Sequence, residues 1–365
     1  MPFIDALLQD MRFGARLIKR SPLLSGAVVL TLALGIGLDT AVFSMINGFF
    51  FRARVEKEPE TFVQVIPRYA GKFERPRGYD DSTTLEDYRA YQSGARALGN
   101  LAAWTNVSAA MGDDPTPDLD LLVTCNFFSL YGLDHAKLGR LFREDECSTP
   151  GAAPVIVISE EMWRRRFAAD PNIVGKVVSL NQHPFTVVGV APALFPGLLK
   201  SGVWIPWTMA PLFYGEDFFR QASVPWLVVE GRLKPRYAKS VALAELQVIA
   251  SQQDRLHPGR KTSLVLTNGS FAQHPQARSM TFWITLFYMG AATLVLLMVC
   301  TNVTTLLLSR ALARRQEIAI RLSLGAGRTR LVGMLLTESC LMAAMAGVIS
   351  SYLGKNLLGK SRQQW

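Results

Sequence analysis

Residues that commonly carry catalysis or bind metal ions are scarce in this 365-residue sequence. It contains only four cysteines and four histidines, and the histidines are scattered along the chain (His135, His183, His257 and His274). Three of them stand beside proline, so we expect surface-loop histidines and not metal ligands or catalytic bases. The motifs H-E-x-x-H, G-x-S-x-G and paired C-x-x-C are absent. These absences leave no support for a metal site or for an extracytoplasmic enzyme.

A phosphate-binding loop of the form G-x-x-x-x-G-K-[ST] is also absent. The glycine-rich segment 325–329 comes nearest to it, but this segment lacks the lysine that reaches the terminal phosphates of a nucleotide. The sequence therefore predicts that the chain is not an ATPase by itself and holds no cofactor.

Charge is nearly absent from three long apolar runs. Residues 282–309 carry no charge, residues 23–51 carry only Asp39, and residues 331–353 carry only Glu338. As a helix, the run 282–309 is about 42 Å long, which exceeds the roughly 30 Å hydrocarbon core of a bilayer. Because three such runs coincide, buried helices of a soluble protein are the weaker interpretation. We predict transmembrane helices at 21–51, 282–309 and 331–354, and the first is too long for a cleaved signal peptide.

The formal charge of +10 gathers next to these predicted spans. Basic residues precede the first span (Arg12, Arg16, Lys19, Arg20) and fill the loop 310–330 (Arg310, Arg314, Arg315, Arg321, Arg328, Arg330). Arginine and lysine near span ends mark the cytoplasmic side, so the charge indicates membrane topology and not nucleic-acid binding. We predict a cytoplasmic N-terminus, an extracytoplasmic block at 52–281 and a cytoplasmic loop at 310–330.

Both ends of the chain add to this topology. Residues 1–20 are expected to form an amphipathic helix on the inner membrane surface, with a plain solvated helix as the alternative. The tail 355–365 places Lys355, Lys360 and Arg362 on the outside, against the charge rule. We therefore expect the chain to stop before a fourth span that would return inward.

The extracytoplasmic block alternates strand-like and helix-like segments, which predicts an α+β fold of two subdomains. Strands are expected at 62–66, 154–159, 177–180, 185–190 and 226–233, with a four-residue turn at 181–184. Helices are expected after a threonine cap at Thr84, after Ser159, and over 240–256. Its aromatic residues are expected in the core (Trp204, Trp207, Phe213, Tyr214, Phe218, Phe219, Trp226).

The four cysteines divide between two environments. Cys300 and Cys340 lie inside predicted spans, where we expect them to act as small apolar residues. Cys125 and Cys147 share the extracytoplasmic block, where a disulfide is permitted. A single pair at unconstrained spacing leaves the bond open.

The cytoplasmic loop has an ordered pattern of charge. Arg310, Arg314, Glu317, Arg321 and Arg328 recur at intervals of three, four and seven residues, which places them on one helical face. Gly325 and Gly327 then interrupt the helix. The pattern indicates a compact basic projection suited to docking on a partner, although charge that merely sets topology is the simpler interpretation.

Two acids lie inside predicted spans, where an ionisable residue is by default functional or paired. Glu338 is near enough to the inner interface to pair with an arginine of the loop. Asp39 stands in the middle of the first run, and the alternative is that it marks the point where the first helix leaves the bilayer.

These motifs together resemble the signature of FtsX/MacB-type ABC transporter permeases. The membrane part carries Asn302, Glu317-Ile318-Ala319-Ile320-Arg321, Leu324-Gly325-Ala326 and Glu338-Ser339. The extracytoplasmic block carries segments similar to the MacB-type periplasmic core domain (Asn126-Phe127-Phe128, Gly139-Arg140-Leu141-Phe142, Trp163-Arg164-Arg165-Arg166-Phe167, Phe185-Thr186-Val187-Val188-Gly189-Val190, Gly231-Arg232-Leu233-Lys234-Pro235).

The resemblance implies a multi-pass permease of the bacterial inner membrane with a large periplasmic domain. It implies a homodimer or one half of a duplicated permease, a separate ABC ATP-binding subunit that holds the ATP, and a periplasmic adaptor or outer-membrane channel as a further partner. The ATPase-coupling residues would be Arg314, Glu317, Arg321, Gly325 and Arg328.

The sequence departs from the family in three places, and two other functions stay open. The family has four spans where three are predicted here, Leu38-Asp39 replaces a small polar pair, and Arg236-Tyr237-Ala238 replaces a glycine-containing turn. The alternatives are a non-transporting regulator of cell-wall hydrolases and a nonfunctional fragment of a longer permease. The substrate is not readable from the residues.

Overall fold

The computed structural model describes residues 22–51, 55, 57–71, 81–112, 118–193, 202–215, 219, 224–275, 277–313, 315–316, 320, 337 and 339–352. The chain divides into a helical unit, formed by residues 1–51 and 276–365, and an extracytoplasmic unit, formed by residues 52–275. The block predicted from the sequence was 52–281, so the second unit ends six residues earlier than predicted.

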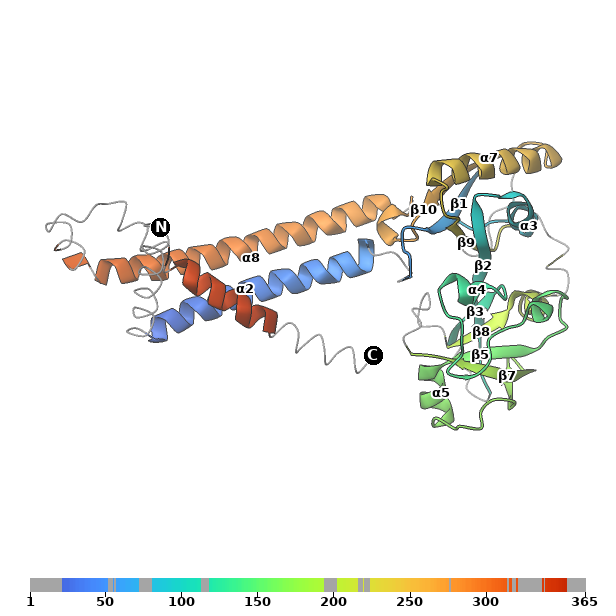
Figure 1. Ribbon diagram of the computed structural model, residues 1–365, viewed down its shortest axis with the longest axis horizontal. Helices are drawn as coiled ribbons and strands as arrows, with labels where there is room; N and C mark the ends of the chain where they lie inside the picture. Colours follow the sequence, from blue (N-terminus) through green and yellow to red (C-terminus); the bar gives the residue numbers. More distant parts are fainter. Residues whose placement is uncertain are drawn as a thin grey trace. The chain divides into compact units, whose positions relative to one another are not determined.

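Long apolar helices build the helical unit (Figure 1). Helix α2 spans Pro22–Ile46 and continues into a five-residue π-helix, η1, at Asn47–Phe51. Helix α8 spans Arg278–Ala313 and runs antiparallel beside α2. A proline at the first helical position suits the start of α2, because the first N–H groups of a helix have no partner within it.

Two of the described helices are long and apolar enough to cross a membrane. They contain the segments Ser25–Ile46 and Ser279–Ser309. The third predicted span, 331–354, is described as a helix only over Ser339–Tyr352. Those residues make about 21 Å of helix, so they do not establish a third crossing.

The three helices pack through small and β-branched side chains. Val28, Val29 and Ala33 of α2 form a buried cluster with Met342 and Ala346 of the helix 339–352. At Gly35 an added Cβ would lie 2.6 Å from Cγ2 of Val299 on α8, so the two helices approach closely because this position is glycine.

One ten-stranded sheet forms the centre of the extracytoplasmic unit, in the order β10-β1-β9-β2-β3-β8-β5-β7-β4, with β6 paired to β7. The strands are β1 (Phe62–Gly71), β2 (Leu98–Ala109), β3 (Asp118–Val123), β4 (Leu138–Gly139), β5 (Val155–Ser159), β6 (Val177–Leu180), β7 (His183–Ala191), β8 (Val203–Pro206), β9 (Val228–Leu233) and β10 (Arg260–Thr267). Pairing is antiparallel except for β3 with β8 and β5 with β7.

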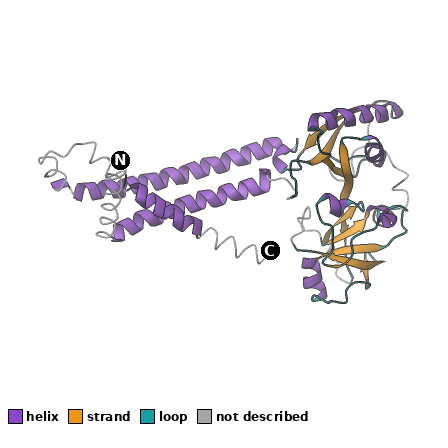
Figure 2. Cartoon of the chain, viewed as in Figure 1, coloured by secondary structure: helices purple, strands orange, loops and turns teal. Residues whose placement is uncertain are grey.

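Helices and helical turns cover this sheet. They are α3 (Leu85–Gly94), α4 (Phe127–Leu130), η2 (Glu144–Cys147), α5 (Glu160–Phe167), η3 (Trp207–Met209), α6 (Pro211–Tyr214), α7 (Lys239–Leu256) and η5 (Phe271–Gln273). The α+β prediction is confirmed. The two predicted subdomains, however, share one hydrogen-bonded sheet, which runs through β2 and β3. Figure 2 shows the strands of this sheet in orange.

Both faces of the sheet are buried. In β5, Ile156 and Ile158 point into one hydrophobic cluster and Val157 points into the other, as the two-residue period of a strand requires. A strand covered on both faces has apolar residues in succession, which is why segment 154–159 was recognisable without alternation.

Local signals place several elements correctly and one turn incorrectly. Thr84 caps α3, since its Oγ1 accepts a hydrogen bond of 3.0 Å from the N–H of Asp87. The β6–β7 hairpin turns on Asn181 and Gln182 alone, both with positive φ (48° and 67°). The predicted four-residue turn is wrong, because His183 and Pro184 pair with β6.

We call β10, β1, β9, α3 and α7 the connecting half, because β1 and β10 join the helical unit. We call β8, β5, β7, β4, β6, α5 and the segment 124–147, which follows β3 and ends with η2, the second half. These two names are used below.

Candidate functional site

The two strands that join the helices are neighbours in the sheet. β1 is the first strand after α2 and η1, and β10 is the last strand before α8. They pair antiparallel from Gln64 with Thr267 to Gly71 with Arg260. The chain therefore enters this unit and leaves it through two strands that are hydrogen-bonded to each other.

A buried ionic group fixes these strands to the helices that cover them. The guanidinium of Arg260, on β10, donates two hydrogen bonds to the carboxylate of Asp87 on α3, at 2.9 and 3.2 Å. Its Nε donates to Asp254 on α7 at 2.7 Å. Tyr69, on β1, donates its hydroxyl to Asp87 at 3.1 Å. We call these four residues the ionic lock.

Burial makes the ionic lock sensitive to the loss of any member. The side chains of Arg260 and Asp87 are 2% and 0% exposed, and that of Asp254 is 16% exposed. Burial alone would lower the pKa of Arg260, but Asp87 and Asp254 outweigh it and raise that pKa. Burial and the charge of Asp87 raise the pKa of Tyr69 well above its ordinary value, so Tyr69 stays a neutral donor. Removing one partner of a buried ion pair costs about 3–5 kcal/mol.

Side chains of helix α7 also form hydrogen bonds with backbone groups along the edge of β10. Asp254 accepts hydrogen bonds from the N–H and the hydroxyl of Thr262, both at 2.6 Å. Gln247 donates to the carbonyl of Thr262 at 2.7 Å and accepts from the N–H of Leu264 at 3.0 Å. An edge strand otherwise presents unpaired backbone groups, so these contacts hold β10 in place along α7.

A second acidic residue holds the connection between β10 and α8. Asp81 accepts a hydrogen bond of 2.9 Å from Gln64 on β1, and the same oxygen lies 3.0 Å from Nε2 of His274. His274 lies between β10 and the start of α8 at Arg278. His257 lies 2.8 Å from Glu86. Both histidines are partly buried and bound to carboxylates, which differs from the predicted surface-loop setting.

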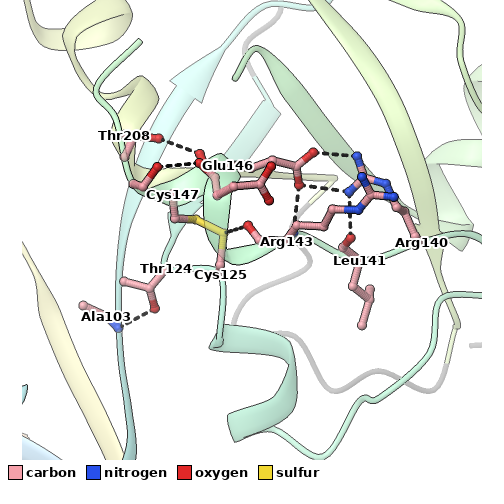
Figure 3. The surroundings of a disulfide bond; sticks show 11 residues. Ala103, Thr124, Cys125, Arg140, Leu141, Arg143, Glu146, Cys147 and Thr208 are labelled. Atoms are coloured by element: carbon pink, nitrogen blue, oxygen red, sulfur yellow. Dashed lines mark hydrogen bonds and ion pairs between the residues drawn. A yellow bond between two sulfur atoms is a disulfide. The ribbon is translucent and has the colours of Figure 1, made fainter. Parts of the chain in front are cut away.

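The second half is held by a covalent bond (Figure 3). Cys125, after β3, and Cys147, in η2, form a disulfide. Beside it, Arg140 binds Glu146 through two hydrogen bonds of 2.9 and 2.5 Å, and the N–H of Arg143 donates to Glu146 at 2.8 Å. Burial would raise the pKa of Glu146, but these donors outweigh it and lower that pKa.

Glu160, at the start of α5, is the other charged centre of the second half. It binds Lys137, accepts two hydrogen bonds from Arg164 at 2.9 and 2.7 Å, and accepts one from the N–H of Ala193 at 2.9 Å. Burial opposes ionisation, but these contacts lower the pKa of Glu160 to about 2.

All five residues of the predicted coupling site, and Glu338, lie outside the described residues. Arg314, Glu317, Arg321, Gly325, Arg328 and Glu338 are all in this group. Helix α8 extends past the predicted span to Ala313, and Arg315 and Gln316 are helical and exposed. The grouping of the loop arginines on one face stays a prediction.

Asp39 lies well inside α2 and is half-buried. Asp39 lies four residues after Gly35, which packs against Val299 of α8. Because α8 runs antiparallel to α2, the corresponding position on α8 is four residues before Val299, at Val295. Position 295 is near the middle of the uncharged run 282–309. The helix continues beyond Asp39 to Ile46 and then through η1. The position of Asp39 within the bilayer stays a prediction.

The ionic lock was not predicted from the sequence. The sequence pattern marks Asp87 only as the acid three residues after the Thr84 cap, but its carboxylate binds Arg260 and Tyr69. Among the residues that the structure describes, no group of three or more histidines, cysteines or acids is placed to hold a metal ion.

In this chain a mixed α+β domain is inserted between two long apolar helices. The family described as MacB-like periplasmic core domain matches residues 25–247, and the family described as FtsX-like permease C-terminal matches residues 289–361. The chain belongs to the MacB/FtsX-type ABC transporter permeases.

Similar curated proteins are larger than this chain. It is 27% identical over 232 residues to the macrolide export ATP-binding/permease protein MacB of Burkholderia pseudomallei, which is 62% of this chain and 33% of that protein. A protein of the same name from Yersinia pestis is 25% identical over 231 residues, with the same coverage. The chain thus spans about a third of the length of the curated relatives it matches.

Solved structures with a similar fold include two extracytoplasmic domains. The periplasmic region of MacB from Actinobacillus actinomycetemcomitans is 17% identical, with a TM-score of 0.41, covering 57% of this chain and 89% of that one. The extracellular domain of YknZ from Gram-positive bacteria is 16% identical, with a TM-score of 0.41, covering 56% and 99%.

Proposed function

We propose that this chain is the permease subunit of an ABC transporter in which a separate subunit hydrolyses ATP. In this proposal, docking of that subunit on the loop 310–330 moves α8 against α2. The movement reaches the extracytoplasmic domain and drives export, or another mechanical response, from the periplasmic side.

The pairing of β1 with β10 is the observation that carries the proposal. The two spans continue into adjacent strands, and the ionic lock binds those strands to α3 and α7. Relative motion of the spans would thus be passed to a braced part of the sheet. Residues 1–365 carry no phosphate-binding loop lysine, so the proposal locates ATP hydrolysis outside them.

The disulfide supports an oxidising location for the domain, because such bonds persist in the periplasm and are rare in the cytosol. We infer an inner-membrane protein with a cytoplasmic N-terminus and a periplasmic domain. We also propose that the chain assembles as a homodimer or pairs with a second permease half. In the same proposal it contacts a periplasmic adaptor or an outer-membrane channel. The names of the curated relatives mention macrolide export. The substrate of this chain is left unassigned.

Capture of an ATPase tests the proposal. The full chain in lipid nanodiscs should retain an ABC ATP-binding subunit co-expressed from the same genome. Glu317→Ala and Arg321→Ala should each abolish this capture, whereas Arg255→Ala, an exposed change on α7, should leave it intact. Capture of no such subunit, or capture that the two loop changes do not affect, would overturn the coupling role.

A further inference from the structure

The two connections between helices and sheet differ in their backbone. On one side α2 is a regular α-helix to Ile46, and η1 follows as a π-helix of five residues. On the other side α8 begins at Arg278 and is α-helical through Ala313. Short π-helical segments are rare, and they occur frequently at functional sites.

Gly48 lies within η1, and packing does not explain its presence. An added Cβ at this position would meet no atom within 4 Å. Glycine is the least favourable ordinary residue in a helix after proline, because its backbone has the most freedom to lose. An uncrowded glycine in a π-helical turn therefore makes the backbone easy to open.

The chain is held firmly on both sides of η1. Before it, α2 packs against α8 at Gly35 and Val299, and against the helix 339–352. After it, Val55 is 2% exposed and belongs to a hydrophobic core of the sheet, with Phe62. Only residues 52–54 separate η1 from that anchor.

On the α8 side, the described residues are held by several hydrogen bonds. Asp81 binds both Gln64 and His274, three residues before Ala277 and the start of α8. The segment between β10 and α8 carries further hydrogen bonds, from the N–H of Asn268 to Gln273 at 3.0 Å and from the N–H of Ser270 to Asn268 at 2.9 Å.

We propose that η1 is a flexible joint, with Gly48 as its softest point, while the connection to α8 is stiff. Movement of α8 would then be passed to β10 more completely than movement of α2 is passed to β1. The two paired strands would therefore be displaced relative to each other along their length. The flexibility of η1 does not depend on an ATPase and can be tested without one. The role of η1 in transmitting motion to the sheet rests on the proposed function.

Hydrogen exchange of the full chain in nanodiscs, without any ATPase, tests the joint. The amides of residues 47–51 should exchange faster than those of 284–288, which lie beyond the first turn of α8. Gly48→Ala should slow the exchange at 47–51 about fivefold, because alanine stabilises a helical turn relative to glycine by about 1 kcal/mol. Equal protection of the two segments in the wild type would overturn the proposal.

Gly26→Ala is the matched control, since Gly26 lies in the regular part of α2 and also has nothing within 4 Å of its added Cβ. It should leave exchange at 47–51 unchanged, and an equal slowing by both variants would contradict a local joint. With the ATPase captured, Gly48→Ala should retain capture but reduce any nucleotide-dependent change in exchange at β1 and β10. Capture that the loop variants leave intact, together with a normal joint, would reject only the proposed function.

Discussion

The connecting half and the second half of the sheet are held together by different chemistry. In the connecting half, buried Arg260 joins two helices and is bound to Asp87, which also binds β1. In the second half, a disulfide and partly exposed ion pairs around Glu146 and Glu160 hold the elements together.

This difference separates a part held by non-covalent contacts from a part held by a covalent bond. A disulfide fixes its two ends covalently and stabilises mainly by restricting the unfolded chain. A buried ion pair stabilises only while its geometry holds, and it destabilises the fold when one partner is lost. The half that receives the membrane helices is thus held by non-covalent contacts that depend on exact geometry.

Loss of the ionic lock should give the largest effect. Asp87→Ala leaves Arg260 buried beside Asp254 alone, and we expect a loss of roughly 3–5 kcal/mol in the free energy of unfolding. Denaturant unfolding of the full chain in detergent, followed by tryptophan fluorescence, measures it. Glu86→Ala, one residue earlier on α3 and partly exposed, should cost under about 1 kcal/mol. Similar small effects of both changes would show that the lock contributes little.

Removal of the disulfide should come next. The bond closes a separation of 22 residues, for which chain entropy predicts about 3 kcal/mol. The double change Cys125→Ser with Cys147→Ser should speed hydrogen exchange in the second half and leave β1 and β10 unchanged. Cys300→Ser, an exposed position on α8, is the control. Equal acceleration in both halves would mean that the two halves do not differ in the way described.

Acid should give the smallest effect, and it should act on the second half. The pKa of Glu160 is lowered to about 2 from an ordinary 4.5. A depressed carboxyl pKa stabilises the fold above the unfolded value, and that stability is lost as pH falls from about 4.5 towards 2. Glu160→Gln should remove this part of the pH dependence, on the order of 1 kcal/mol, because Lys137 and Arg164 are screened by solvent. The exposed Glu161→Gln should retain the full pH dependence, and an identical profile for both would rule out Glu160 as its source.

Elements defined by local patterns were predictable. The strand 155–159, the cap at Thr84 and the helix starting at 239–240 follow from apolar spacing and from one capping side chain. The β6–β7 turn was placed correctly but made too long, because proline at 184 signals a turn and only the pairing with Ser179 shows a strand.

Contacts between distant positions were not predictable. Asp87 and Arg260 are 173 residues apart, and neither stands in a pattern that distinguishes a buried ion from a solvated one. The single sheet was missed for the same reason, since pairing of β2 with β9 and of β3 with β8 depends on long-range register. Recognition of the family, by contrast, required only ordered local motifs.

The pairing of β1 with β10 also determines how the domain can be moved between proteins. Gln64 and Thr267 are direct partners, and antiparallel partners lie about 5 Å apart, so the chain enters and leaves the sheet at one place. A domain with adjacent ends can be inserted into a host chain, or exchanged, without forcing the flanking segments apart. Residues 55–275 therefore form a cassette in a helical hairpin, which permits chimaeras that keep one set of membrane helices and vary the domain.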